Sequence, residues 1–313
     1  MIALVTGAAG FIGSHLAERL LARGASVVGI DCFTDYYARE LKEANLAALW
    51  THPGFRFVET TIQAAEWPAL LPGVTHVFHL AAQAGIRGSW GRDFRLYTAN
   101  NIDATQVLLE ACRDAPLQRI VHASSSSVYG DAAGTPMRED AQLQPVSPYG
   151  ATKLAAEHLC RLYCRSYGLP TVSLRYFTVY GPRQRPDMAF RRFLTALHNR
   201  TELTLYGDGT QTRDFTFVAD AVDATVAAGL RGAPGEVYNI GGGSQVSMND
   251  ALALIARCTG RTPNVRRQDP GRGDMRDTWA DTSRARRDLG YAPSVNLEQG
   301  ILAEYEWLSA TLS

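Results

Sequence analysis

Three features are absent from the 313-residue sequence: a long apolar run, an excess of one charge and a CxxC pair of cysteines. No apolar run approaches the roughly 20 residues that a membrane-spanning helix needs. Lysine and arginine together number 31, as do aspartate and glutamate, so no net charge draws the chain to nucleic acid or to an anionic membrane. We therefore expect no nucleic-acid or membrane partner, and a small-molecule ligand.

The five cysteines do not indicate a metal site or a disulfide framework. None of them forms a CxxC motif, and their odd number favours reduced thiols, so we expect no metal. The first ten residues, MIALVTGAAG, have no basic stretch and do not resemble a secretory signal. These features predict a cytoplasmic protein.

Short apolar runs alternate with amphipathic stretches through the first half of the chain. The runs IALVTG, ASVVGID, THVFHLAA and RIVHASS have the length of buried strands, whereas FIGSHLAERLLARG has helical spacing of its apolar residues. This alternation predicts βαβ units and hence a doubly wound parallel (Rossmann) sheet. We expect residues 1–174, with part of 215–240, to form the domain that contains it.

Further elements are predicted along the chain, and the pattern becomes less regular after about residue 175. Helices are predicted at DATQVLLEACRDA, GATKLAAEHLCRLYCRSYG and MNDALALIARCTG, and strands at TVSLRYF and EVYNIG. The segments YGPRQRPDM, LYGDGTQTRDF and DPGRGDMRD predict charged loops, and loop arginines suit an anionic ligand. Residues 175–313 are therefore expected to form a smaller α/β substrate-binding region.

A glycine loop joins the first predicted strand to the first predicted helix. Gly7, Gly10 and Gly13 form the pattern TGxxGxxG, which lets the backbone approach a pyrophosphate at a helix N-terminus. Asp31 ends the next predicted strand, where its carboxylate can accept both hydroxyls of a ribose. The same carboxylate would repel a 2′-phosphate, so the pattern predicts NAD rather than NADP as cofactor.

A tyrosine and a lysine lie one helical turn apart at the start of a predicted helix. Tyr149 and Lys153 share one helix face at this spacing, so the ammonium can favour the phenolate and lower the tyrosine pKa. Upstream, the serines 124–127 follow the apolar run RIVHA, where a sheet strand would end. We therefore expect Tyr149 to act as an acid/base and Ser125 to share the substrate proton.

With these elements in this order, the chain resembles the extended short-chain dehydrogenase/reductase family of sugar-nucleotide enzymes. The resemblance covers essentially the whole chain, through the blocks TGAAGFIGSHL, HLAAQAGIR, NNIDAT, SSSSVYG, SPYGATK, RYFTVYGPRQRPDM, GDGTQTRDF and GRGDMRDTWAD. It implies that Tyr149 removes the proton of the C4 hydroxyl while a hydride passes from C4 to the nicotinamide. Lys153 would hold the nicotinamide ribose, and Ser125 would support the transfer.

The resemblance also implies the wider binding residues. Those expected at NAD are Gly7, Gly10, Phe11, Ile12, Gly13, Asp31, Ile62, Leu80, Ala81, Ala82 and Lys153. Those expected at the substrate are Ser126, Ser127, Asn100, Thr178, Arg185, Arg213, Arg272 and Asp274. Relatives usually have aspartate at the place of Thr61, so this chain departs from the family at the adenine contact.

The residues around the serine run favour one branch of the family. Related dehydratases have an Asp-Glu pair where Ser126 and Ser127 stand, because elimination needs an additional acid and base. Related decarboxylases usually have a glutamate in this stretch, which is also missing. The segment TVYGPRQRPDM most resembles UDP-glucuronate 4-epimerases, in which Arg185, Thr178 and Ser127 would bind the sugar carboxylate.

Several alternatives remain open at this stage. UDP-glucose/UDP-galactose 4-epimerase and UDP-glucuronate decarboxylase are the alternatives within the family, and a non-catalytic NAD-sensing regulator is the alternative outside it. Relatives commonly form homodimers through two helices per subunit, which the resemblance places near DATQVLLEACRDA and GATKLAAEHLC. The sequence does not fix the sugar, which could also be an N-acetyl sugar.

Overall fold

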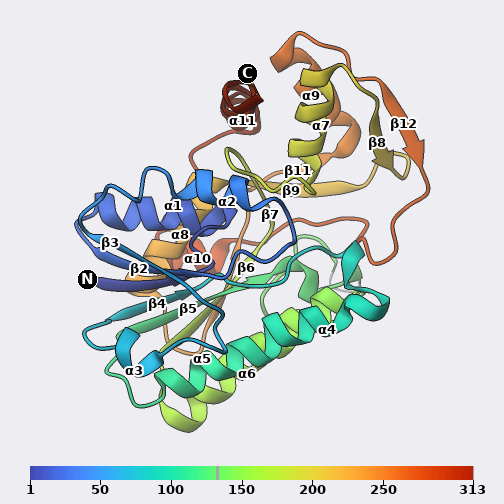
Figure 1. The fold of residues 1–313 in the computed structure, drawn as a ribbon. Helices are drawn as coiled ribbons and strands as arrows, with labels where there is room; N and C mark the ends of the chain where they lie inside the picture. Colours follow the sequence, from blue (N-terminus) through green and yellow to red (C-terminus); the bar gives the residue numbers. More distant parts are fainter. Residues whose placement is uncertain (132–133, 313) are drawn as a thin grey trace.

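A seven-stranded parallel sheet forms the centre of the molecule in this computed structural model, which describes residues 1–131 and 134–312 (Figure 1). The strand order is β10-β6-β5-β4-β1-β2-β3, and every pairing is parallel. The strands of this sheet are β1 (Ile2–Thr6), β2 (Ser26–Asp31), β3 (Phe55–Glu59), β4 (His76–His79), β5 (Arg119–Ser125), β6 (Thr171–Tyr176) and β10 (Val237–Ile240). The predicted doubly wound sheet is confirmed.

Helices cover both faces of this sheet, and with it they form what we call the large lobe (Figure 1). On one face lie α1 (Phe11–Ala22), α2 (Arg39–Leu46), α8 (Val218–Arg231) and α10 (Ser283–Leu289). On the other lie α3 (Trp67–Leu70), α4 (Phe94–Tyr97), α5 (Ala104–Cys112) and α6 (Pro148–Tyr167). Two apolar cores result, because a parallel sheet buries both faces.

Short helical segments link α4 to its neighbours. They are η1 (Arg87–Ser89), η2 (Gly91–Asp93) and the π-helical η3 (Thr98–Asp103), whereas η4 (Ser126–Val128) directly follows β5. Within η3 the Asn101 side chain is buried, where its Oδ1 accepts from the Gln83 amide at 2.7 Å and its Nδ2 donates to Thr152 Oγ1 at 2.9 Å. These bonds join η3 to the strand end at Gln83 and to α6.

The remaining elements form a smaller body at one end of the sheet, which we call the small lobe (Figure 1). It contains a three-stranded sheet, β11-β9-β7, and a parallel pair, β12-β8. Its elements are β7 (Thr178–Tyr180), α7 (Ala189–Asn199), β8 (Leu203–Tyr206), β9 (Thr212–Phe217), β11 (Gln245–Ser247), α9 (Met248–Thr259), β12 (Val265–Gln268) and α11 (Leu297–Leu312). A third core, which includes Phe190, Phe215 and Ile301, holds these elements together.

The prediction that LYGDGTQTRDF forms a charged loop is wrong in part. Leu205 and Tyr206 belong to β8, and the segment from Thr212 onward forms β9. Several side chains of β9 are polar, so its sequence did not indicate a strand. The strand forms because its backbone pairs with β7 on one side and with β11 on the other. Such pairing between distant segments is not visible in local periodicity.

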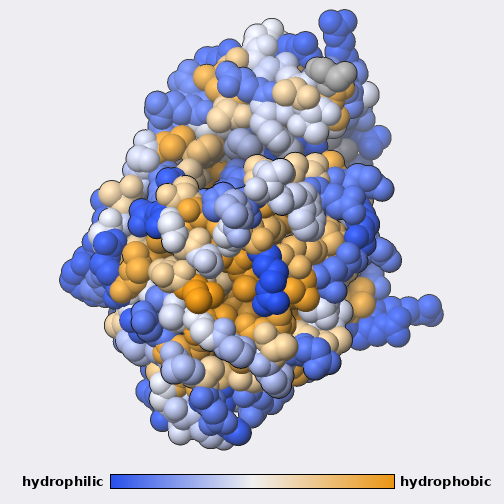
Figure 2. Space-filling view, turned by 60° about the vertical axis from the view of Figure 1, so that its left-hand side comes forward, coloured by the Kyte–Doolittle hydropathy of each residue, from blue (hydrophilic) through white to orange (hydrophobic). Residues whose placement is uncertain are grey.

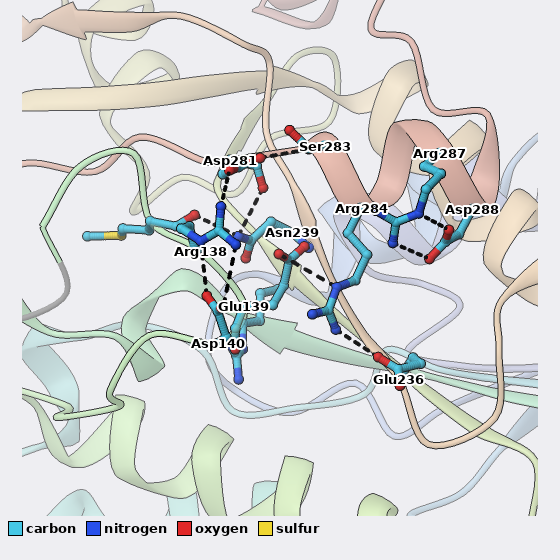
Figure 3. Close-up of polar contacts among 12 residues, drawn as sticks. Arg138, Glu139, Asp140, Glu236, Asn239, Asp281, Ser283, Arg284, Arg287 and Asp288 are labelled. Atoms are coloured by element: carbon cyan, nitrogen blue, oxygen red, sulfur yellow. Dashed lines mark hydrogen bonds and ion pairs between the residues drawn. The ribbon is translucent and has the colours of Figure 1, made fainter.

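The last connection from the small lobe returns to the large sheet. Met137 N donates to Trp279 O at 2.7 Å, and Asp281 N donates to Met137 O at 2.8 Å. Around this crossing Figure 3 shows ion pairs that join Arg138 to Asp281 and Arg284 to Glu236. The segment that follows β12 is thus fixed to β10 and to the loop after β5.

The surface of the protein is not uniformly polar. On the face shown in Figure 2, hydrophobic residues gather in the middle and hydrophilic residues surround them. Over the whole described chain, the most exposed large hydrophobic side chains are Leu162, Tyr167 and Trp50. None of the described helices is long and apolar enough to span a membrane.

Candidate functional site

One large cavity of about 700 Å³ lies at the carboxyl ends of the parallel strands, between the two lobes. Both lobes contribute to its lining. The predicted site residues that line it are Gly7, Gly10, Phe11, Ile12, Gly13, Asp31, Ile62, Leu80, Ala81, Ala82, Asn100, Ser125, Ser126, Ser127, Tyr149, Lys153, Thr178, Arg185, Arg213 and Asp274. The structure therefore brings these distant segments to a single site, as the resemblance implied.

The glycine loop is packed so closely that side chains are excluded from it. Gly7 has φ of 72°, and a Cβ placed there would lie 2.8 Å from Ala81 N. A Cβ on Gly13 would lie 2.0 Å from Gly7 O, so only glycine lets α1 start against this turn. The resulting bare backbone at the N-terminus of α1 fits a pyrophosphate.

Asp31 lies at the end of β2, on the wall of the same cavity. Its two carboxylate oxygens accept hydrogen bonds from Ala9 N and Phe33 N, both at 3.1 Å. Burial raises the pKa of Asp31, and the amide of Phe33 and the Lys42 ammonium oppose this effect. The carboxylate is thus held in place beside the glycine loop, and this arrangement fits the dinucleotide that the loop predicts.

The two residues at the expected adenine contact, Thr61 and Ile62, line the cavity on the other side of Asp31. The Thr61 hydroxyl accepts from Ala64 N at 3.1 Å, and Ile62 O accepts from Trp67 Nε1 at 3.2 Å. The Thr61 hydroxyl therefore already has a partner within its own turn.

Asn100 also lines the cavity, although its side-chain amide donates to Leu96 O at 2.9 Å.

The start of α6 places Tyr149 and Lys153 in the cavity. The helix begins at Pro148, and the Ser147 hydroxyl caps it by accepting from Gly150 N at 3.1 Å. Tyr149 is hydrogen bonded to the Ser125 side chain, which comes from the end of β5. The phenol, the hydroxyl and the ammonium are therefore assembled from one helix and one strand end.

The expected effect of Lys153 on the pKa of Tyr149 is wrong in this structure. Burial raises the pKa of Tyr149, and the groups that oppose the rise are the Ser125 hydroxyl and the Arg185 guanidinium. Burial also lowers the pKa of Lys153 to about 8, so the ammonium itself loses stability in the same apolar surroundings. Helical spacing correctly predicted that Tyr149 and Lys153 share a helix face. It could not predict that desolvation has a larger effect on the pKa of Tyr149 than the nearby charge.

Arg185 approaches Tyr149 from the loop that follows β7. Its guanidinium donates from Nε and Nη2 to the two carboxylate oxygens of Asp187, both at 3.0 Å. Tyr36 donates to the same carboxylate at 3.1 Å from the loop after β2. Since Thr178 also lines the cavity here, this end of the site offers a hydroxyl and a guanidinium to an anionic group.

The small lobe supplies a second basic region to the cavity. Arg213 donates from Nη1 to Thr212 O at 2.7 Å, and burial lowers its pKa. Asp274 forms an ion pair with Arg87 at 2.7 Å, and the guanidinium of Arg87 lies 3.7 Å from the centroid of the Tyr206 ring. Arg192 lies 5.7 Å from the centroid of the same ring, and an aromatic ring beside two arginines suits a nucleoside diphosphate.

Arg272 is the one predicted substrate residue that does not line the cavity. It is exposed on its loop, two residues before Asp274. The sequence block GRGDMRD places both residues near the site but cannot say which of them faces inward. The tight turn at Gly273, where φ is 81°, separates the two side chains.

Several lining residues were missed by the sequence reasoning. They are Tyr36, Arg87, Asp187, Arg192, Tyr206 and Gln211. Arg87 ends the block HLAAQAGIR, and Asp187 lies within RQRPDM, so both residues belong to blocks that carry the family resemblance. Tyr206 gave no local signal, because its place depends on the pairing of β8 with β12.

Together, the glycine loop, Asp31 and the Tyr149–Lys153 pair define a dinucleotide-binding α/β protein with an acid/base site beside the cofactor cleft. Residues 3–241 match the family described as NAD dependent epimerase/dehydratase family. The chain belongs to this family.

Related proteins match over nearly the full length of the chain. A Bacillus subtilis protein described as an uncharacterized UDP-glucose epimerase is 46% identical over 311 residues, covering 98% of both chains. The UDP-glucuronate 4-epimerase of Thermodesulfobacterium geofontis is 37% identical, covering 97% of this chain and 95% of its own. A crystal structure of UDP-glucuronic acid 4-epimerase from Bacillus cereus, in complex with UDP-glucuronic acid and NAD, matches with a TM-score of 0.96 and 45% identity over 99% of this chain and all of that one.

Proposed function

We propose that this chain catalyses the NAD-dependent epimerisation of UDP-glucuronate to UDP-galacturonate at C4. The observation that carries the proposal is that Tyr149, Lys153, the glycine loop and Arg185 all line one cavity. The similarity to UDP-glucuronate 4-epimerases over nearly the whole chain supports it.

The glycine loop, Asp31 and Lys153 would hold the cofactor against the sugar. NAD, when bound, supplies a hydride acceptor that takes hydrogen from C4 and later returns it. Tyr149 accepts the proton of the C4 hydroxyl, and Ser125 stabilises the phenolate by donating its hydroxyl hydrogen. After the 4-keto sugar has turned its other face, Tyr149 returns the proton, so the reaction needs no further acid or base.

The carboxylate of the sugar would bind at Arg185, Thr178 and Ser127, which all line the cavity. The 4-keto form of a uronic acid is a β-keto acid, which readily loses carbon dioxide. Charge-assisted bonds to the carboxylate oppose this loss, because decarboxylation would disperse the charge that they stabilise. Arg213 would bind the diphosphate, with Asp274 pairing to Arg87 nearby and Asn100 and Ser126 beside the sugar.

Incubation of the purified protein with UDP-glucuronate, followed by NMR of the products, tests the proposal. An equilibrium mixture with UDP-galacturonate is expected. UDP-xylose as product would instead identify a decarboxylase, and turnover of UDP-glucose alone would identify a UDP-glucose/UDP-galactose 4-epimerase. The second alternative has support from MoeE5, which is 40% identical and was crystallised with UDP-glucose as well as with UDP-glucuronic acid. Bound NAD without turnover of any UDP-sugar would indicate a sensing role.

We also propose that the chain forms a homodimer through α5 and α6. Leu162 and Tyr167 on α6 are 56% and 55% exposed, and burial of such side chains would stabilise association. Leu162→Glu should therefore shift sedimentation toward the monomer. Leu230→Glu, on α8 across the sheet, is the matched control and should not. Equal behaviour of the two variants would contradict this interface.

Two further assignments stay proposals. Residues 1–174, with part of 215–240, would form the NAD-binding domain, and residues 175–313 the substrate-binding domain. Residues 132–133 and 313 lie outside the described part of the chain. The five free thiols of the chain are consistent with a reducing, cytoplasmic environment.

A further inference from the structure

Helix α6 carries a third polar residue in line with Tyr149 and Lys153. Glu157 follows Lys153 by one helical turn, so the three side chains share one face of the helix. Unlike the other two, Glu157 does not line the cavity, and it is buried beneath the site with only 5% of its surface exposed. A carboxylate in such a place is stable only if several donors surround it.

The donors around Glu157 come from two neighbouring strands. Ser124 on β5 donates its hydroxyl to Glu157 Oε2 at 2.8 Å. Arg175 on β6 donates from Nε to Oε2 at 3.0 Å and from Nη2 to Oε1 at 2.6 Å. The carboxylate therefore ties α6 to the strand that ends in Ser125 and to the strand that leads to Thr178.

The same hydrogen-bond network continues toward the small lobe. Arg175 Nη1 donates to the hydroxyl of Tyr129 at 2.8 Å, and Tyr129 donates to Asn239 Oδ1 at 2.6 Å. Asn239 Nδ2 in turn donates to Met137 O at 2.9 Å and to Asp281 O at 3.2 Å. Figure 3 shows Asn239 at this crossing, next to Asp281 and Arg138. The network thus extends from the helix that carries the acid/base to the chain returning from the substrate loops.

We infer that Glu157 is a positioning residue of the epimerisation: it fixes α6 on β5 and β6 and places a negative charge one helical turn from Lys153. This inference rests on the function proposed above. Glu157 does not touch the substrate in this scheme. It acts through Lys153, which holds the cofactor, and through the strand that ends at Ser125.

The titratable groups near Lys153 come from every element packed around it. They are Tyr149, Glu157 and Cys160 on α6, His79 on β4, His122 on β5, and Arg175 on β6, which contacts Glu157.

The charges of these groups single out Glu157. The pKa values of His79 and His122 are lowered by burial, so both rings are neutral at the pH of the reaction. Burial raises the pKa of Cys160 to about 12, so that thiol is neutral too. Glu157 is therefore the group with negative charge that favours the ammonium form of Lys153, whose pKa is lowered to about 8.

Glu157→Gln tests this role, because glutamine keeps the shape and one acceptor but removes the charge. The wild-type kcat for UDP-glucuronate should fall above pH 8, as Lys153 loses its proton. In Glu157→Gln this alkaline limb should move about one pH unit lower. The KM for UDP-glucuronate should stay within about twofold, since the residues at the sugar and diphosphate are untouched.

Two companion variants separate positioning from mere stability. Glu157→Asp keeps the charge and should leave the alkaline limb where it is in the wild type, although a shorter side chain lowers kcat. Thr225→Val removes a buried hydrogen bond to Tyr176 of 2.6 Å on the opposite face of the sheet, and should lower Tm without moving the limb. A limb that stays fixed in Glu157→Gln, or moves equally in all three variants, overturns the inference.

Ser124→Ala covers the case in which Glu157→Gln does not fold. It removes one donor to the carboxylate and should lower kcat severalfold at unchanged KM, whereas an unchanged kcat overturns the inference. The wild-type protein separates this test from that of the proposed function: if it does not epimerise UDP-glucuronate, the proposed function fails first. If it does and the variants behave alike, only the role of Glu157 fails.

Discussion

The two lobes contribute to the cavity in different ways. The large lobe places Ser125, Tyr149 and Lys153 on a strand end and a long helix, and buried hydrogen bonds hold both elements. The small lobe contributes Arg213 and Tyr206 from short strands whose positions depend on pairing with distant segments. Under the proposed function, the large lobe would carry the chemistry and the small lobe would recognise the nucleotide part of the substrate. This division predicts that changes in the large lobe alter kcat, whereas changes in the small lobe alter KM.

Tyr149→Phe should produce the largest effect, because it removes the group that accepts the substrate proton. We expect kcat to fall about 10³-fold, the contribution of a well-placed general base. The NAD content of the purified variant should equal that of the wild type, since Tyr149 is not needed to hold the cofactor. NMR of the products and absorbance of released cofactor measure the two quantities.

Tyr163→Phe is the matched control for this change. Tyr163 lies further along α6, where its hydroxyl contacts Glu110 and Gln106 away from the cavity. It should leave kcat within twofold of the wild type. Normal turnover by Tyr149→Phe would refute the acid/base assignment.

Arg185→Gln should affect one sugar more than the other. If Arg185 binds the uronate carboxylate, loss of its charge should lower kcat/KM for UDP-glucuronate about 50-fold, the value of a bond to a charged group. The rate with UDP-glucose, which has no carboxylate, should change much less. Parallel assays with the two UDP-sugars give this ratio.

Arg183→Gln tests whether any loop arginine would have the same effect. Arg183 stands two residues earlier and forms an ion pair with Glu18 at 2.7 Å instead of lining the cavity. Its loss should not change the preference between the two sugars. An equal drop for both substrates in Arg185→Gln would show that this arginine acts on a step common to both sugars, such as proton transfer by Tyr149, rather than on the sugar carboxylate.

The sequence predicted the large lobe far better than the small one. Local pattern was enough for the glycine loop, for Asp31 and for the Tyr149–Lys153 face, because each depends on a few consecutive residues. It failed where the result depends on burial or on distant pairing. The raised pKa of Tyr149 needs the desolvation of the complete site, and the place of Tyr206 needs the partner strand β12.

Arg213→Gln should raise the KM for both UDP-sugars about 10-fold and leave kcat within twofold, if the small lobe serves binding alone. The guanidinium of Arg213 lines the cavity beside Asp274 and far along the chain from the acid/base pair. Steady-state kinetics with each UDP-sugar measure the effect.

Arg272→Gln supplies the comparison, because the resemblance implied a binding role for both arginines. In the structure Arg272 is exposed and outside the lining of the cavity. Its replacement should therefore leave KM unchanged. A larger effect on kcat than on KM in Arg213→Gln would remove the proposed division between the lobes.

The smallest expected effect concerns the pH at which each lobe loses stability. In the small lobe burial raises the pKa of Glu304 on α11 to about 8, and its carboxyl group accepts from Gly181 N at 2.8 Å. Between pH 4.5 and 8 the folded state keeps a proton that the unfolded chain has lost, so the free energy of unfolding decreases as the pH rises. Glu304→Gln removes this dependence and should raise Tm by about 2–4 °C at pH 8 but little at pH 5.

The large lobe should respond at the opposite end of the pH scale. Burial lowers the pKa of His79 to about 3, so below pH 6.5 the unfolded chain binds a proton that the folded state does not, and stability decreases as the pH falls. Because Glu304→Gln leaves His79 in place, Tm should still fall in acid but no longer in mild base. Glu306→Gln, at an exposed position on the same helix, should follow the wild-type curve at every pH. If Glu304→Gln and Glu306→Gln gave the same curve, the alkaline loss of stability would have its origin outside the small-lobe core.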